Sequence, residues 1–136
     1  MRWLNLPLVI GLLSLMAASA LTQEYQPYPS PRITQEQWAR YGEQVRQNHG
    51  ASLGVFEDKQ LIAFSDERTL TFWVFTMKKH PAHPALITRQ VYEEGGQIHV
   101  RQIGYFAASE DEFAKLFREY QMRNEELKQA VERRNR

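Results

Sequence analysis

The stretch Thr69–Met77, TLTFWVFTM, decides the fold of this 136-residue chain. It is rich in β-branched and aromatic residues, which favour an extended strand. Alternate side chains of a strand point to opposite faces. One face here carries Leu70, Phe72 and Val74, and the other carries Trp73, Phe75 and Met77. Because both faces are apolar, we predict that this segment is the buried central strand of a sheet.

Shorter strand-like segments lie on its N-terminal side. SLGVF at 52–56 and QLIAF at 60–64 flank a turn-like run at 57–59, and SDER at 65–68 is typical of the next turn. Short connections of this kind join antiparallel neighbours. The three segments therefore predict consecutive strands of an antiparallel meander.

A glycine pair predicts the last hairpin and its register. Gly95-Gly96 suits a two-residue type I′ turn. Pairing Glu94 with Gln97 then places Tyr92 opposite His99. One face of this hairpin carries most of the apolar load together with two polar residues: Ile87, Val91, Ile98, Val100, Phe106, Arg89 and Gln102. We assign that face to the core.

The opposite face of the hairpin is the leading candidate for a binding surface. It carries four polar or aromatic side chains: Tyr92, His99, Arg101 and Tyr105. Tyr and Arg are enriched in binding hot spots. The alternative is that one or both helices cover this face and make it the second half of the core.

An N-terminal helix is predicted from Thr34. Thr34 and Gln37 form a capping box, and Ile33 and Trp38 form a hydrophobic staple across it. Gly50 suits the left-handed position that ends such a helix.

A long C-terminal helix is predicted from Ser109, with Glu112 completing a second capping box. Its apolar stripe has heptad spacing with one polar member: Phe113, Phe117, Tyr120, Asn124, Leu127 and Val131. Beyond Asn124 the stripe thins. We therefore expect the end of the helix, about 124–136, to protrude or to pair with a partner helix in a dimer.

These elements predict one α+β domain over residues 33–136. Its core is an antiparallel β-meander of about four to five strands, flanked by an N-terminal helix and a long C-terminal helix. We expect the helices to cover one face of the sheet.

The N-terminus predicts a secretory signal peptide over residues 1–20. Arg2 is followed by an apolar run, and Ala18-Ser19-Ala20 fits the small-residue cleavage rule. The protein is then periplasmic or secreted, with no membrane span after cleavage. The alternative is an uncleaved anchor, because residues 3–21 approach the ~20 residues that span a bilayer. Residues 21–32 contain three prolines and predict an extended, solvated tether, with the alternative that Tyr25 and Tyr28 dock on the domain.

The composition excludes several classes of protein. There is no cysteine, so neither a disulfide framework nor a lipidated cysteine is available. Removing Arg2 with the signal peptide leaves 16 basic residues against 16 acidic ones. That balance argues against nucleic acid as a partner, because such proteins need a basic face.

One short motif suggests a metal site. His80-Pro81-Ala82-His83-Pro84 places two imidazoles three residues apart, and Zn or Cu needs at least one further ligand, for which His99 is the candidate. The competing interpretation is a stiff turn between two strands, since both prolines favour extended geometry before them.

A second motif, Gly50-Ala51-Ser52-Leu53-Gly54, matches G-x-S-x-G. A nucleophile elbow needs a strand before the serine and a helix after it, and here the predicted order is reversed. A hydrolase that uses Ser52 is thus a remote alternative to a helix end followed by a strand.

The expected function is that of a small exported binding or accessory protein without enzymatic activity or a cofactor. Its partner is expected to be another protein or a small ligand in the periplasm, bound through a sheet face or the C-terminal helix. The alternative is a periplasmic Zn- or Cu-binding protein that uses the His-Pro-Ala-His-Pro loop.

We predict that the exported chain starts at Leu21, because a signal peptidase cuts after small residues such as Ala20. Intact-mass spectrometry of C-terminally tagged protein from a bacterial periplasm measures this directly. A membrane-bound product that retains Met1 would instead establish the anchor.

Overall fold

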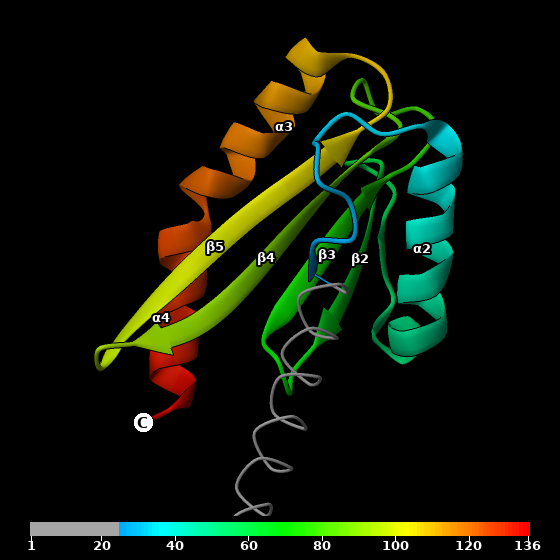
Figure 1. The fold of residues 1–136 in the computed structure, drawn as a ribbon. Helices are drawn as coiled ribbons and strands as arrows, with labels where there is room; N and C mark the ends of the chain where they lie inside the picture. Colours follow the sequence, from blue (N-terminus) through cyan, green and yellow to red (C-terminus); the bar gives the residue numbers. More distant parts are fainter. Residues whose placement is uncertain (1–24) are drawn as a thin grey trace, which may run out of the picture.

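The computed structural model describes residues 25–136 (Figure 1). The predicted signal peptide and the first residues of the predicted tether lie outside the described residues. No helix between Tyr25 and Arg136 is long and apolar enough to cross a lipid bilayer.

The centre of the fold is a five-stranded antiparallel sheet with strand order β1-β2-β3-β4-β5 (Figure 1). The strands are β1 Gly54–Phe56, β2 Leu61–Asp66, β3 Thr71–Thr76, β4 Ala85–Glu94 and β5 Gln97–Phe106. The central position of β3 is confirmed, and so is the α+β class. The turn that follows β2 lies after Asp66, slightly later than predicted.

The register predicted for the last hairpin is confirmed. Glu94 pairs with Gln97, and Tyr92 pairs with His99. Gly95 and Gly96 have φ angles of 61° and 77°, the left-handed values that a type I′ turn requires and that glycine adopts without strain.

The N-terminal helix, α2, spans Gln35–His49 and begins with the predicted capping box between Thr34 and Gln37. Its predicted end is wrong, because Gly50 is right-handed at φ −59°. The chain continues instead into a 3-10 turn, η2 Gly50–Ser52, in which the Leu53 N–H bonds to the Gly50 carbonyl.

The C-terminal helix is long but broken. Ser109 caps α3, Glu110–Met122, as predicted, and α4 follows over Asn124–Arg134. The end does not protrude: α4 packs against β5, and Val131 is buried (Figure 1). The sequence suggested protrusion because the apolar stripe thins, but the narrow tip of the β4–β5 hairpin needs little apolar cover.

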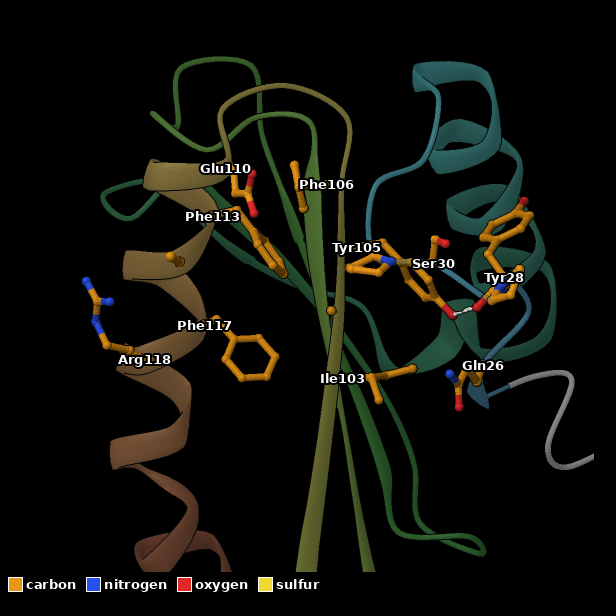
Figure 2. A pocket seen from close by; sticks show the side chains of 14 residues that line it. Gln26, Tyr28, Ser30, Ile103, Tyr105, Phe106, Glu110, Phe113, Phe117 and Arg118 are labelled. Carbon is orange, nitrogen blue, oxygen red and sulfur yellow. Dashed lines mark hydrogen bonds between the residues drawn. The ribbon is translucent and has the colours of Figure 1, made fainter.

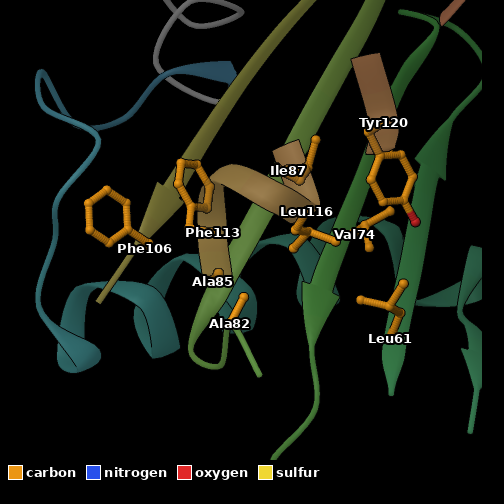
Figure 3. Close-up of a cluster of buried hydrophobic side chains, with 9 residues drawn as sticks. All are labelled: Leu61, Val74, Ala82, Ala85, Ile87, Phe106, Phe113, Leu116 and Tyr120. Atoms are coloured by element: carbon orange, nitrogen blue, oxygen red, sulfur yellow. The ribbon is translucent and has the colours of Figure 1, made fainter. Parts of the chain in front are cut away.

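Helices cover both faces of the sheet, so the expectation of one covered face is wrong. In Figure 1, α2 lies on one side of the strands, and α3 and α4 lie on the other. The α3 side is shown in Figure 3 and consists of Leu61, Val74, Ala82, Ala85, Ile87, Phe106, Phe113, Leu116 and Tyr120. The α2 side consists of Ile33, Tyr41, Val45, Phe64, Trp73, Phe75, Leu86 and Tyr105. The two apolar faces of β3 require this cover on both sides.

The polar residues on the core face of the hairpin meet at the helix break. The Gln102 side-chain amide donates to the Phe117 carbonyl at 2.9 Å and accepts from Asn124 at 3.0 Å. Arg89 donates to the Asn124 side chain at 3.4 Å and lies 4.9 Å over the Tyr120 ring. Burial lowers the pKa of Arg89. Asn124, the polar residue of the heptad stripe, therefore forms hydrogen bonds with the two polar residues of the sheet, Arg89 and Gln102.

Gly104 allows α3 to approach β5. A Cβ at this position would lie 2.6 Å from Cζ of Phe113 and 3.1 Å from Cδ1 of Ile87. Phe113 in turn stacks on Phe106, with ring centroids 4.8 Å apart. Because Gly104 has no side chain, the aromatic face of α3 can pack directly on β5.

We predict that Gly104→Ala destabilises the fold by about 1–3 kcal/mol, because the added methyl overpacks the contact with Phe113. Gly42→Ala is the matched control. Gly42 lies inside α2, where a Cβ would meet Phe75 at an ordinary 3.5 Å. Alanine should stabilise that helix by about 0.5–1 kcal/mol. Urea unfolding measures both, and a neutral Gly104→Ala would contradict the tight contact.

Candidate functional site

A groove of about 460 Å³ lies along the outer edge of β5 (Figure 2). We call it the β5 groove. Its floor is the strand itself at residues 103–106, and its two walls are α3 and the segment of residues 26–31. Figure 2 looks onto this edge and shows the two walls standing on either side of β5.

The α3 wall is aromatic and fixed by packing. Phe113 and Phe117 lie four residues apart, so they fall on the same face of the helix, with ring centroids 5.8 Å apart. Ala114 lies between them and also lines the groove. Arg118 is exposed beside this wall.

The opposite wall is the segment that was predicted to be a solvated tether. The described part packs on the sheet instead. Tyr28 meets Tyr105 edge-to-face at 5.6 Å, and the Tyr105 hydroxyl donates to the Tyr28 carbonyl at 2.7 Å and accepts from the Tyr28 N–H at 3.2 Å. Burial raises the pKa of Tyr105, which keeps this donor protonated. Tyr28 therefore holds this segment on the sheet through its contacts with Tyr105.

One end of the groove is closed by residues 31–33. The Phe106 N–H donates to the Pro31 carbonyl at 2.9 Å, and the Ile33 N–H donates to the Phe106 carbonyl at 2.9 Å. This forms a short parallel bridge on the edge of β5. The Arg32 guanidinium lies 4.6 Å over the Phe106 ring and reaches Glu110 on α3 at 3.7 Å.

The predicted binding patch is only partly assembled. Tyr92 stacks on His99 at 5.4 Å, and Arg101 lies 4.5 Å over the Tyr92 ring. Arg101 also lies 5.5 Å over Tyr25. Tyr105 is not part of this surface: it is 2% exposed, covered by α2 and by the segment around Tyr28.

The structure does not bring the three histidines of the metal hypothesis together. His80 and His83 lie in the loop before Ala85, whereas His99 pairs with Tyr92 at the other end of β4. Seven strand residues separate the two places, roughly 20 Å. Within residues 25–136, no group of three or more ligating side chains could hold a metal ion.

The loop histidines have structural partners. His80 to His83 form a β-turn, in which the His83 N–H donates to the His80 carbonyl at 3.0 Å. Nδ1 of His80 accepts from the Ala82 N–H at 3.0 Å, so a neutral ring carries its proton on Nε2. Nδ1 of His83 lies 3.2 Å from the Thr76 carbonyl, which can only accept. The His80 ring therefore supports the turn from within, and the His83 ring holds it on the end of β3.

Ser52 has a structural role as well. Its hydroxyl donates to the His49 carbonyl at 2.6 Å and accepts from the Ser65 N–H at 2.8 Å. It lies in the turn between α2 and β1, the reverse of the strand-to-helix order that a nucleophile elbow needs. The hydroxyl ties the end of the helix to β2.

The β5 groove was not predicted, although its parts were visible. The aromatic pair Phe113 and Phe117 and the proline-rich segment with Tyr28 were both recognised. The sequence did not indicate that α3 and residues 26–31 both lie beside β5, which is an edge strand of the sheet. The described lining holds one glutamine, one serine, one carboxylate and one guanidinium in an otherwise apolar and aromatic surface, which is suited to holding a ligand.

Comparison of the chain with protein-family models, curated protein sequences and solved structures gave no significant match.

We predict that the fold loses stability between about pH 7 and pH 5 through the loop histidines. Burial lowers the pKa of His80 and of His83 below the ordinary 6.5. As the pH falls past 6.5, the unfolded chain therefore binds more protons than the folded one, and the free energy of unfolding decreases.

The double variant His80→Asn/His83→Asn tests this, because an amide can keep the turn bonds without titrating. Urea unfolding at several pH values should show a smaller loss on acidification than in the parent protein. An equal loss would assign the effect to other groups.

Proposed function

We propose that this protein is an exported, non-enzymatic binding protein whose ligand lies in the β5 groove. The observation that carries the proposal is the groove itself: about 460 Å³, with aromatic side chains on both walls. Binding pockets of proteins commonly measure ~300–1,000 Å³ and are mostly apolar, with a few polar groups that orient the ligand.

The rigidity of both walls supports binding at this place. Phe113 stacks on Phe106 and packs directly against Gly104. The backbone of Tyr28 forms two hydrogen bonds with the Tyr105 hydroxyl. A site whose side chains are already fixed loses little conformational entropy when a ligand enters.

The proposed role keeps the C-terminal helix as a binding element and moves the site from the sheet face to the sheet edge. Tyr92, His99 and Arg101 form a smaller surface at the far end of the hairpin, which we call the turn-end patch. Export rests on the predicted signal peptide at residues 1–20.

We predict saturable binding of the neutral apolar dye N-phenyl-1-naphthylamine, followed by its fluorescence. Ala114→Arg should weaken the affinity by about tenfold or more, since it fills the groove and forces a guanidinium against aromatic walls. Ala130→Arg is the matched control, because Ala130 is an exposed alanine of α4 outside the groove.

Tyr92→Ala and Arg101→Ala complete the set. If these two variants weaken dye binding and Ala114→Arg does not, the ligand site is the turn-end patch. If the dye does not bind in a saturable way to any of the proteins, the β5 groove is not a site for apolar ligands.

A further inference from the structure

We infer that the ligand of the β5 groove is an extended polypeptide segment that adds a strand to the edge of β5. The inference rests on the proposed binding role and names the class of ligand. It follows from the direction of backbone groups on β5, from the prolines beside it and from the chemistry of the two walls.

The outer edge of β5 presents backbone donors and acceptors to the groove. In an antiparallel pair, successive residues alternately bond to the partner strand and point away from it. Phe106 points away from β4, because its N–H and carbonyl bond to Pro31 and Ile33. The continuous register with β4 then gives Gly104 and Gln102 the same outward direction.

The outward backbone groups of Gly104 and Gln102 make no backbone hydrogen bond with any other part of residues 25–136. Gly104 is a buried residue on the floor of an apolar groove. Backbone groups in such a place are costly to leave without a partner. A ligand that offers alternating N–H and carbonyl groups at strand spacing meets this need, and a hydrocarbon does not.

The chain itself shows that this edge accepts a strand and why it stops after a few residues. Residues 31–33 pair in parallel with Phe106, at the closed end of the groove. Immediately before them the sequence reads Pro27-Tyr28-Pro29-Ser30-Pro31. Proline has no N–H to donate to a strand. The prolines therefore turn the segment away from the edge and leave the rest of the edge for another strand.

The walls define which strand fits. Side chains of an added strand point alternately to the two sides, toward Phe113 and Phe117 on one side and toward Tyr28 and Ile103 on the other (Figure 2). Both sides are mostly apolar, Glu110 at the closed end is already paired with Arg32, and Arg118 is exposed beside the α3 wall. The expected occupant is an uncharged extended segment with apolar side chains on both faces, in the mode known as β-augmentation.

A second copy of this protein fits the edge less well than a free segment. Its β5 would bring the same two walls, α3 and residues 26–31, on either side of its own strand (Figure 2). The two pairs of walls would meet before the two strands reached the ~4.8 Å spacing of a sheet. We therefore assign the groove to an extended segment of a partner protein.

The test begins with selection from a random library of displayed octapeptides on the purified mature chain. Ala114→Arg serves as the counter-selection target, and Ala130→Arg as a target that should retain the same peptides. We expect uncharged sequences with apolar residues at most positions. Recovery of no peptide that prefers the parent protein to Ala114→Arg overturns the inference.

Selected peptides are then synthesised with single N-methyl groups along the backbone. Methylation at the alternate amides that face β5 should weaken binding by about tenfold or more, and methylation at the intervening amides should change it little. This alternation separates strand pairing from binding through side chains alone. A peptide whose affinity is insensitive to methylation at every position contradicts strand addition.

Amide hydrogen exchange locates the pairing on this chain. The N–H groups of Gly104 and Gln102 should become protected when the peptide binds, whereas Ile103 is already bonded to β4 and should change little. Peptide binding without new protection at Gly104 overturns the inference. If the groove binds the dye but no peptide, the proposed binding role stands and only the inference of a peptide ligand is refuted. If sedimentation experiments show dimerisation through β5, the occupant is a second copy of this protein.

Discussion

The structure depends on the burial of β3 from both sides. Trp73 and Phe75 point to α2, and Val74 points to α3, so no single layer of helices can cover this strand. The Trp73 indole is also held by a hydrogen bond and a ring contact: its N–H donates to the Tyr41 hydroxyl at 3.1 Å, and its ring stacks on His49 with centroids 4.7 Å apart. A three-layer arrangement, with α2 on one face of the sheet and α3 and α4 on the other (Figure 1), follows from this one strand.

Covering both faces leaves the edges of the sheet as the places where a partner can gain access. Long edge strands are a hazard for folded proteins, because their free backbone groups can pair with other chains. Here residues 31–33 cap one end of the edge of β5, and Arg32 ties that cap to Glu110. The neighbouring prolines prevent further pairing by this segment. Residues 26–33 thus both protect one end of the β5 edge and form one wall of the proposed binding site.

Local signals in the sequence predicted the elements well. The capping residues Thr34 and Ser109 act within one turn of a helix, and Gly95-Gly96 acts within one hairpin, so each could be recognised without knowledge of the rest of the chain. The prediction for Gly50 is wrong because the chain continues into η2, where the Leu53 N–H bonds to the Gly50 carbonyl and the Ser52 hydroxyl accepts from the Ser65 N–H of β2. The partners of Arg89 and Gln102 could not be recognised from the sequence, because Asn124 and the Phe117 carbonyl lie far along the chain on α4 and α3.

By itself, the sequence determined the strands, the central place of β3, the register of the last hairpin and the starts of the helices, because propensity, alternation and capping are local properties. Only the tertiary structure decided that helices cover both faces, that Tyr105 is buried, that the histidine loop stays far from His99 and that residues 26–31 stand beside β5. These outcomes depend on contacts between segments far apart in the chain, such as Tyr28 with Tyr105 and Phe113 with Gly104. The candidate groove belongs to this second group, since its walls come from opposite ends of the described chain.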